Sequence, residues 1–253
     1  MTYKRIIGRL DIKGPNVIKG IRLEGSRVVG SPDELASEYY QDGIDELIYV
    51  DSVASLYGRN NLHGIVSRAA KKNFIPLTVC GGIRSVDDVQ TLLNAGADKV
   101  AVNTEATKNP QLISDIAGRF GSQCMVLSVE AKKTSKGWWE ALTDNGRDHT
   151  GKNVEDWVKE AESFGAGEIF LTSVDKDGTM TGFDFELVEK VSSIVKIPVI
   201  ACGGLGNIDH LEDVFKIAKA DAAACGTVFH YRKITVSELK KQGLNRGLNL
   251  RYE

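Results

Sequence analysis

The chain has 253 residues, of which 42% are hydrophobic and 26% charged, with a formal net charge of −2. This balance excludes a basic surface for nucleic acid and a disordered chain, and it is ordinary for a folded α/β protein. No stretch approaches the roughly 18 apolar residues of a membrane span, and the N-terminus leads directly into a strand-like segment. We therefore expect a cytoplasmic protein that binds neither nucleic acid nor membrane.

Short runs rich in β-branched residues alternate with helical segments along the chain. Eight runs are candidate strands: Arg5 to Leu10, Glu46 to Val50, Pro76 to Val79, Lys99 to Val102, Met125 to Val129, Glu168 to Leu171, Pro198 to Ala201 and Ala222 to Cys225. Eight alternating strand–helix units favour a closed parallel barrel over an open, doubly wound sheet.

Helix-start and helix-stop signals lie between these runs. The clearest start is Ser31-Pro32-Asp33-Glu34, a capping box with proline at the first helical position. Ser85-Val86-Asp87-Asp88 and Asn109-Pro110 open two more helices. Glycines that would close helices in the left-handed conformation stand at Gly43, Gly96, Gly121 and Gly165.

An internal repeat strengthens the barrel prediction. Cys80-Gly81-Gly82-Ile83 recurs 122 residues later as Cys202-Gly203-Gly204-Leu205. At the same offset, Asp45-Glu46-Leu47-Ile48 corresponds to Gly167-Glu168-Ile169-Phe170. Neither half could bury its sheet alone. The sequence thus predicts one (β/α)8 barrel domain over residues 1–253, built from two similar (β/α)4 halves.

One stretch, Ala131 to Lys152, is the single irregularity in this pattern. It is polar, contains Trp138-Trp139 and a turn-like Asp144-Asn145-Gly146, and predicts a hairpin inserted after the fifth strand. Its tryptophans would form either a local cluster or a lid over the barrel mouth, and we favour the cluster.

Glycines and hydroxyl-bearing residues follow the strands at the end where the active sites of such barrels lie. One group is Gly82, Asn103 and Thr104, and the other is Gly204, Gly226 and Thr227. Glycines let backbone N–H groups approach an anion, and a following helix N-terminus adds positive charge. A single Gly-Gly pair is equally well a tight turn. Two at repeat spacing predict two phosphate sites and a substrate with a phosphate at each end.

Two carboxyl groups occupy equivalent strand ends in the two halves. Asp11 ends the first strand and Glu130 ends the fifth, so the repeat places them across the mouth from each other. Singly, either is as easily a solvated loop residue or a helix cap. Together, between two phosphate sites, they predict a pair in which one group donates a proton and the other accepts one. Asp51, Thr172 and Asp177 are further polar residues at strand ends.

At the opposite face, four strands begin with a charged residue: Arg5, Glu46, Lys99 and Glu168. Any one of them alone could be an ordinary surface charge. Two acids and two bases at matched depth can instead form a ring that closes the bottom of the barrel.

Cysteine and histidine usage indicates neither a disulfide framework nor a metal site. Cys80, Cys124, Cys202 and Cys225 are far apart and form no CxxC motif, and the four histidines lack metal-ligand spacing. We expect buried thiols and no metal.

Taken together, these residues resemble the cyclase subunit family of imidazole glycerol phosphate synthase, a barrel that receives ammonia from a glutaminase partner. The resemblance covers nearly the whole chain. Matching stretches are Lys4-Arg5-Ile6-Ile7, Leu10-Asp11-Ile12-Lys13, Val17-Ile18-Lys19-Gly20, Gly43-Ile44-Asp45-Glu46-Leu47, Gly96-Ala97-Asp98-Lys99-Val100, Gly165-Ala166-Gly167-Glu168-Ile169, Asp177-Gly178-Thr179 and Val228-Phe229-His230.

The resemblance implies a reaction and its participants. The substrate would be a bisphosphate in which a formimino link joins an imidazole-carboxamide ribonucleotide to phosphoribulose. Ammonia would join it, the chain would cleave, and the imidazole ring would close. The products would be imidazole glycerol phosphate and an aminoimidazole carboxamide ribotide, and no cofactor or metal would be needed.

The resemblance also implies residue roles. Asp11 would be the principal acid/base, and Lys19 would lie on a mobile loop that closes over the substrate. One phosphate would bind at Gly82, Asn103 and Thr104, and the other at Asp177, Gly178, Gly204, Gly226 and Thr227. The ring of Arg5, Glu46, Lys99 and Glu168 would be the ammonia gate, and Asp98 would lie on the N-terminal face that meets the glutaminase in a heterodimer.

Two positions depart from the family pattern. The family has Asp where this chain has Glu130, and a small residue, usually Cys, where it has Arg9. Strand alternation puts Arg9 on the same face as Asp11, so it would point into the barrel along the presumed ammonia path. A buried guanidinium must be paired, and we expect Glu130 to be its partner.

Three functions therefore stay open. The first is the histidine-pathway cyclase. The second is a paralogue that delivers glutaminase-derived ammonia to another acceptor, such as a sugar amidinated in surface-polysaccharide synthesis. The third is the related phosphoribosyl isomerase of the same pathway, which shares the half-barrel repeat and both phosphate sites. The charged ring argues against the isomerase, because an isomerase needs no ammonia entry.

Overall fold

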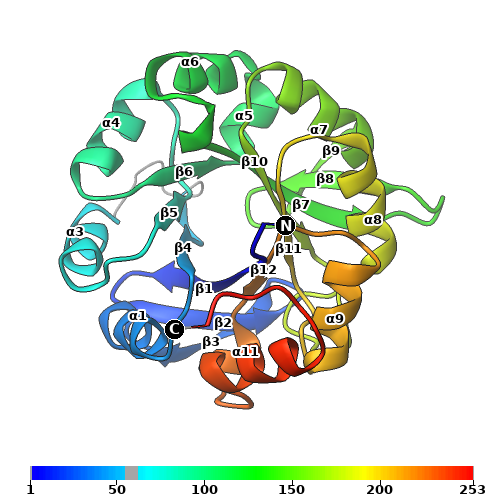
Figure 1. Ribbon diagram of the computed structural model, residues 1–253. Coiled ribbons are helices and arrows are strands. Elements are labelled where there is room, and N and C mark those ends of the chain that lie inside the picture. Colours follow the sequence, from blue (N-terminus) through cyan, green and yellow to red (C-terminus); the bar gives the residue numbers. More distant parts are fainter. Residues whose placement is uncertain (1, 55–61, 253) are drawn as a thin grey trace.

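A computed structural model describes residues 2–54 and 62–252 of the chain and confirms the predicted barrel (Figure 1). The barrel strands are β1 (Arg5–Lys13), β4 (Glu46–Asp51), β5 (Leu77–Cys80), β6 (Lys99–Val102), β7 (Met125–Lys133), β10 (Glu168–Ser173), β11 (Val199–Cys202) and β12 (Ala222–Cys225). Each pairs in parallel with the next, and β12 closes onto β1. Their carboxyl ends therefore meet at one mouth.

Helices surround the strands on the outside of the barrel (Figure 1). They are α1 (Pro32–Gln41), α3 (His63–Lys72), α4 (Val86–Asn94), α5 (Thr104–Lys108), α6 (Gln111–Phe120), α7 (Val154–Ser163), α8 (Phe185–Ile194), α9 (Ile208–Lys216), α10 (Thr227–His230) and α11 (Val236–Asn245), with a 3₁₀ turn at Ser122–Cys124. The expected caps are present: Ser31 accepts from the Glu34 backbone N–H, and Ser85 forms a reciprocal capping box with Asp88.

Apolar residues form two separate groups because alternate strand residues face opposite sides of the sheet. Outward-facing residues pack under the helices. Inside the barrel, a layer of buried residues, which we call the apolar layer, consists of Ile7, Ile48, Val50, Cys80, Ala101, Val126, Phe170, Ile200, Cys202, Ala222 and Ala224. The barrel interior is thus filled by side chains.

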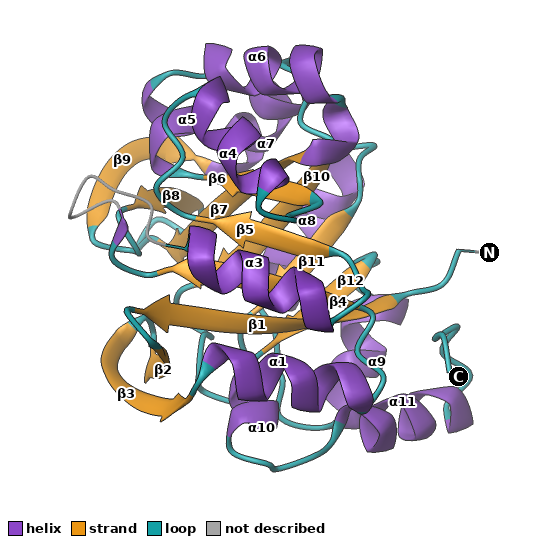
Figure 2. Cartoon of the chain, turned by 90° about the vertical axis from the view of Figure 1, so that its left-hand side faces the viewer, coloured by secondary structure: helices purple, strands orange, loops and turns teal. Residues whose placement is uncertain are grey.

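Both halves carry an antiparallel hairpin at the mouth end of their first strand. β1 continues into β2 (Asn16–Ile21) and β3 (Glu24–Gly30), and β7 continues into β8 (Trp139–Thr143) and β9 (Asp148–Asn153). Figure 2 shows both hairpins at the end of the barrel opposite the two termini. The expectation that the second hairpin is a single irregularity was wrong, because the first hairpin is its counterpart.

The tryptophan at the start of β8 belongs to a local cluster. Trp139 is 1% exposed, its Nε1 donates to Asp184 at 2.9 Å, and the amines of Lys133 and Lys190 lie over its ring. A buried, hydrogen-bonded indole is not a lid over the mouth.

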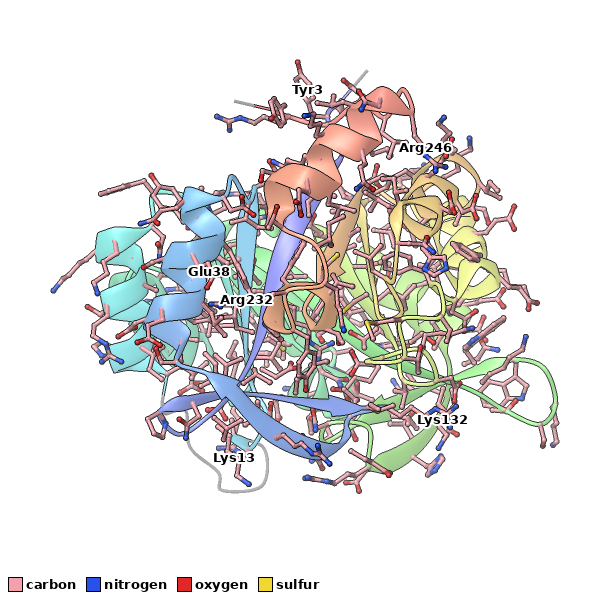
Figure 3. The ribbon with its side chains drawn as sticks, turned by 90° about the horizontal axis from the view of Figure 1, so that it is seen from below. Tyr3, Lys13, Glu38, Lys132, Arg232 and Arg246 are labelled. Atoms are coloured by element: carbon pink, nitrogen blue, oxygen red, sulfur yellow. The ribbon has the colours of Figure 1, made fainter. Side chains whose placement is uncertain are left out.

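At the N-terminal face, three aspartates fix the beginnings of strands in the same way. Each precedes a strand by one residue and accepts an N–H from the first or second residue of a neighbouring strand: Asp45 from Ile6 at 2.7 Å, Asp98 from Leu77 at 2.8 Å and Asp221 from Val199 at 3.0 Å. Figure 3 shows Tyr3 and Arg246 at this end of the molecule, with Lys13 and Lys132 at the mouth end. One oxygen of Asp98 therefore holds the start of β5 in place, although the residue is exposed.

No helix within residues 2–54 and 62–252 combines the length and the apolar character that crossing a bilayer requires. The cytoplasmic location expected from the sequence stays a prediction.

A glycine at the mouth gives a test of this packing. Gly204 has φ +108°, and an added Cβ would overlap the carbonyl oxygen of Gly182. We expect Gly204→Ala to lower the free energy of unfolding by about 1–3 kcal/mol, because it combines backbone strain with a backbone clash. The matched control is Gly118→Ala in α6, where nothing lies near the new methyl group.

This control should stabilise the protein by about 0.5–1 kcal/mol, the usual gain from replacing glycine in a helix. Urea unfolding measures both effects. Equal effects of the two substitutions would contradict the packing described for Gly204.

Candidate active site

A cavity of about 140 Å³ at the mouth lies over the carboxyl ends of β4 to β7 and β10. It is lined by the three residues proposed for the first phosphate, Gly82, Asn103 and Thr104, and also by Asp51, Glu130 and Thr172. Arg84 and Lys108 line it too. These cations were missed in the sequence, although Arg84 follows the Gly81-Gly82 pair closely enough to be noticed.

A second, smaller cavity of about 20 Å³ lies at the ends of β11 and β12. It is lined by all five residues proposed for the second phosphate, namely Asp177, Gly178, Gly204, Gly226 and Thr227, and also by Lys19. The structure therefore brings each predicted set together around a cavity of its own. Arg9 lines both cavities and so lies between them.

The helices that directly follow Asn103 and Gly226, one in each predicted phosphate site, are short. α5 after Asn103 has five residues and α10 after Gly226 has four. Such short helices carry little dipole. Anion binding in these cavities would rest on backbone N–H groups and side-chain cations instead.

Arg9 is buried at the centre of the mouth, with 3% of its surface exposed. Its Nε donates to Asp11 Oδ1 at 2.7 Å, and its Nη1 donates to Thr172 Oγ1 and Cys202 Sγ, each at 3.3 Å. The guanidinium carbon lies 5.6 Å from the ring centroid of Phe170, which belongs to the apolar layer. Arg9 thus separates that layer from the mouth.

Lys19 lies in strand β2, which corrects the expectation of a loop at this position. The strand forms because β2 pairs with both β1 and β3. Lys19 is 4% exposed, and its Nζ contacts Asp177 at 2.8 Å and Asp11 at 3.2 Å. Lys19, Arg9, Asp11 and Asp177 form a neutral group of two cations and two anions, which we call the upper cluster.

Both oxygens of Asp11 are occupied by cations of the upper cluster. Burial alone would raise its pKa, but Arg9 and Lys19 hold the pKa of Asp11 at about 2. The same contacts raise the pKa of Lys19 in spite of its burial. Asp11 is therefore an anion throughout the neutral pH range.

Glu130 has a different environment. Its Oε2 accepts from Asn103 Nδ2 at 3.1 Å and from the Gly146 N–H at 2.8 Å. Burial raises the pKa of Glu130 to about 7. The prediction of an ion pair between Glu130 and Arg9 was wrong. The guanidinium pairs instead with Asp11, two residues away on the same face of β1, and Glu130 accepts a hydrogen bond from the β8–β9 turn.

At the opposite end of the barrel, Arg5, Glu46, Lys99 and Glu168 form a closed ring of ion pairs, which we call the lower ring. Glu46 accepts from Arg5 at 2.7 Å and from Lys99 at 3.3 Å, and Glu168 accepts from both cations as well. Both carboxylates are less than one-tenth exposed. Although burial alone would lower it, these carboxylates raise the pKa of Arg5.

Within the described residues, no cluster of histidine, cysteine, aspartate and glutamate side chains has the composition of a metal site. The four cysteines are buried free thiols, and burial raises the pKa of Cys80 to about 12. A buried protonated thiol is a poor nucleophile.

Comparison with known proteins gives a consistent result. Residues 5–235 match the family model described as histidine biosynthesis protein. The chain is similar to imidazole glycerol phosphate synthase subunit HisF of Legionella pneumophila, with 66% identity over 83% of this chain and 99% of that protein. It is 47% identical to the proteins of the same name from Streptococcus sanguinis and Streptococcus gordonii, over 99% of this chain and 100% of each relative.

The environment of Glu130 predicts a pH-dependent stability. Its pKa of about 7 in the folded protein exceeds the ordinary value of 4.5. The folded state thus binds more protons than the unfolded state between these values, and Glu130 destabilises the fold increasingly as the pH rises through this window.

Glu130→Gln removes this titration but keeps an oxygen for Asn103 and Gly146. We expect the variant to be more stable than the wild type above pH 7, by about 2 kcal/mol, and equally stable near pH 4. Urea unfolding across this pH range measures the difference. A difference that does not vary with pH would contradict the raised pKa.

Proposed function

Because this chain belongs to the family of histidine biosynthesis proteins, we propose that it is the cyclase subunit of imidazole glycerol phosphate synthase. Its relatives with 47–66% identity carry that name, and the matches extend over 83–99% of this chain. The observation that carries the proposal is the pair of cavities at one mouth, separated by charged side chains, above a closed ring of ion pairs.

The substrate we propose is the formimino-linked bisphosphate. One phosphate would bind in the first cavity at Gly82, Asn103 and Thr104, near the cations Arg84 and Lys108. The other would bind in the second cavity at Gly204, Gly226 and Thr227, where Lys19 and Arg9 supply positive charge. Asp51, Thr172, Asp177 and Gly178 complete the walls of the two cavities.

Ammonia would join this substrate between the two phosphates, after which the chain cleaves and the imidazole ring closes. The carboxyl groups proposed to serve these steps are Asp11 and Glu130, at the ends of β1 and β7. Proton transfer by a positioned carboxyl group typically contributes about 10²–10⁴-fold to the rate. No cofactor or metal enters the proposed reaction.

A glutaminase subunit would supply the ammonia from the N-terminal face. The lower ring lies at that face and would act as the gate, since its four ion pairs close the barrel. Asp98 stands beside Lys99 of the ring and is exposed, so its remaining oxygen is available to a partner. We propose that the two subunits meet here as a heterodimer, and that they work in the cytoplasm.

One observation favours a second candidate. Arg9 separates the apolar layer from the mouth, on the path that ammonia would take from the ring to the substrate. A cation there, where the family has a small residue, would suit a paralogue that delivers ammonia to a different acceptor, such as a sugar. The lower ring does not favour the isomerase, because an isomerase takes up no ammonia.

Turnover of the formimino bisphosphate tests the proposed function directly. The purified chain, supplied with ammonium chloride at pH 8.5 and no partner, should release imidazole glycerol phosphate. Glu130→Gln should lower this rate by about 100-fold or more, because it removes the titrating carboxyl group at the cavity. Product formation followed by absorbance measures both rates.

The paralogue would show the opposite pattern. In that case the wild type would release no product although it is folded, while the double variant Arg9→Cys with Glu130→Asp, which restores the family residues, would gain activity.

The partner face can be tested by a change that spares the fold. Asp98→Asn removes the charge but keeps an oxygen for the Leu77 N–H. We expect the variant to associate with the glutaminase subunit of the same organism several-fold more slowly than the wild type at low salt, and the difference to vanish at high salt, where the charge is screened. Stopped-flow binding measures the rate.

The control is Asp115→Asn, an exposed position on the outer helix α6. It should leave association unchanged. Equal slowing by both variants would indicate a general charge effect and would argue against a partner surface at Asp98.

A further inference from the structure

The two carboxyl groups at the mouth are held in opposite ways. Asp11 is 7% exposed, and each of its oxygens contacts a cation: Oδ1 lies 2.7 Å from Arg9 Nε and Oδ2 lies 3.2 Å from Lys19 Nζ. Asp11 lines neither of the two cavities described above and instead lines a small one of about 10 Å³. A substrate proton could reach this carboxylate only if an ion pair opened first.

Glu130 faces the space where a substrate would lie. It lines the first cavity beside Asn103 and Thr104. Both of its hydrogen bonds go to Oε2, so Oε1 makes none with any residue in the described part of the chain. One oxygen is anchored, and the other is available for proton transfer.

The cause of this asymmetry is the side chain at position 9. The Arg9 guanidinium is locked over Phe170 and hydrogen-bonded to Thr172 and Cys202, which places its Nε against Asp11. A small residue at this position would leave that oxygen of Asp11 without its cation. The state of Asp11 therefore depends on Arg9.

We propose that Arg9 is a positioning residue that fixes Asp11 as a permanent anion, so that Glu130 is the one carboxyl group at the mouth that exchanges protons with the substrate. This inference rests on the proposed function and narrows its two candidate carboxyl groups, Asp11 and Glu130, to Glu130 alone. Asp11 then holds Arg9 and Lys19 in place, while Glu130 is the catalytic residue for proton transfer.

Proton transfer through one carboxyl group balances. Ammonia forms a C–N bond at the ketone carbon of the phosphoribulose part, and the ketone oxygen leaves as one molecule of water. The Glu130 carboxylate takes a proton from the new nitrogen, so an N–H bond breaks and an O–H bond forms. That nitrogen then closes the ring at the formimino carbon, and the C–N bond between this carbon and the departing ribotide breaks. The same carboxylic acid returns that proton to the nitrogen that leaves when the chain cleaves. Glu130 ends in its starting state, and Asp11 exchanges no proton.

Burial and the surrounding charges bring the pKa of Glu130 close to neutral pH. Burial raises its pKa to about 7, the Gly146 N–H and Arg9 oppose this, and Asp11 and Asp144 add to it. The other charged groups around the first cavity are Asp51, Arg84, Glu105 and Lys108. A group that titrates near neutral pH can serve as both acid and base.

Carboxyl titration by ¹³C NMR tests the charge states without any substrate. In protein labelled at its side-chain carboxyl carbons, the resonance lost in Glu130→Gln should have its midpoint near pH 7. The resonance lost in Asp11→Asn should show no titration above pH 4. Arg9→Cys should move both midpoints to higher pH, and Arg9→Lys, which keeps the charge, should move them less.

An Asp11 midpoint between pH 5 and 8, or a Glu130 midpoint near its ordinary value, would overturn the inference. If the titration midpoints of Asp11 and Glu130 were the same in Arg9→Cys as in the wild type, the proposed role of Arg9 would be overturned. Because this experiment uses no substrate, it gives its answer even if the bisphosphate is not turned over, a result that would refute the proposed function alone.

The pH dependence of turnover tests the second part of the inference, that Glu130 exchanges protons with the substrate. The wild-type profile should have a limb near pH 7 that is absent in Glu130→Gln, with a loss of about 100-fold or more. Asp11→Asn should keep the limb and move it to lower pH, because removing an anion near Glu130 lowers its pKa. A limb that survives in Glu130→Gln, or disappears in Asp11→Asn, would assign the proton transfer to Asp11 instead.

Discussion

The interior of this barrel must be electrically neutral, and much of its chemistry follows from that constraint. An ion taken from water into a protein core costs several kcal/mol unless an opposite charge and hydrogen bonds compensate. Strand β1 turns Arg5, Ile7, Arg9 and Asp11 to the interior, because alternate residues share a face. Strand β1 therefore brings charge to both ends of the barrel, and other residues have to supply the opposite charges.

The charges are compensated in different ways at the two ends of the barrel. In the lower ring, Glu46 and Glu168 come from two other strands, and each accepts from both cations, so the charges alternate around the barrel. In the upper cluster, Arg9 meets Asp11 of its own strand, and the hairpin contributes Lys19 to complete the balance with Asp177. The hairpin is thereby tied to the mouth through charge, and Glu130 is left outside the cluster.

Much of this architecture could be predicted from the sequence, since barrel strands, helix caps and the repeat all leave local signals. Residues such as Gly82 and Gly226 could be assigned to the mouth because the repeat sets their positions at strand ends. The hairpin β2–β3 could not, because its second strand is exposed over most of its length and contains Gly25 and Ser26, which are weak strand formers.

The partner of Arg9 was also beyond sequence reasoning. Alternation shows that Arg9 points inward, and neutrality requires an acid, but the four acids predicted at strand ends all stand at the mouth: Asp11, Asp51, Glu130 and Asp177. The choice depends on side-chain reach: Nε lies 2.7 Å from Asp11, while the backbone of the β8–β9 turn holds Glu130 away. Pattern identifies the face and the charge, and only geometry identifies the contact.

The apolar layer between the two charged groups has a consequence for whatever crosses the barrel. An ion entering it would give up its hydration shell and meet only side chains such as Ile7, Val126 and Ile200, whereas a small neutral molecule would lose little. The layer therefore acts as a filter on protonation state: ammonia can dissolve in it and ammonium cannot. If nitrogen is delivered from below, as proposed, it would leave its extra proton at the ring, so the pH on the lower side, and not at the mouth, would set the supply.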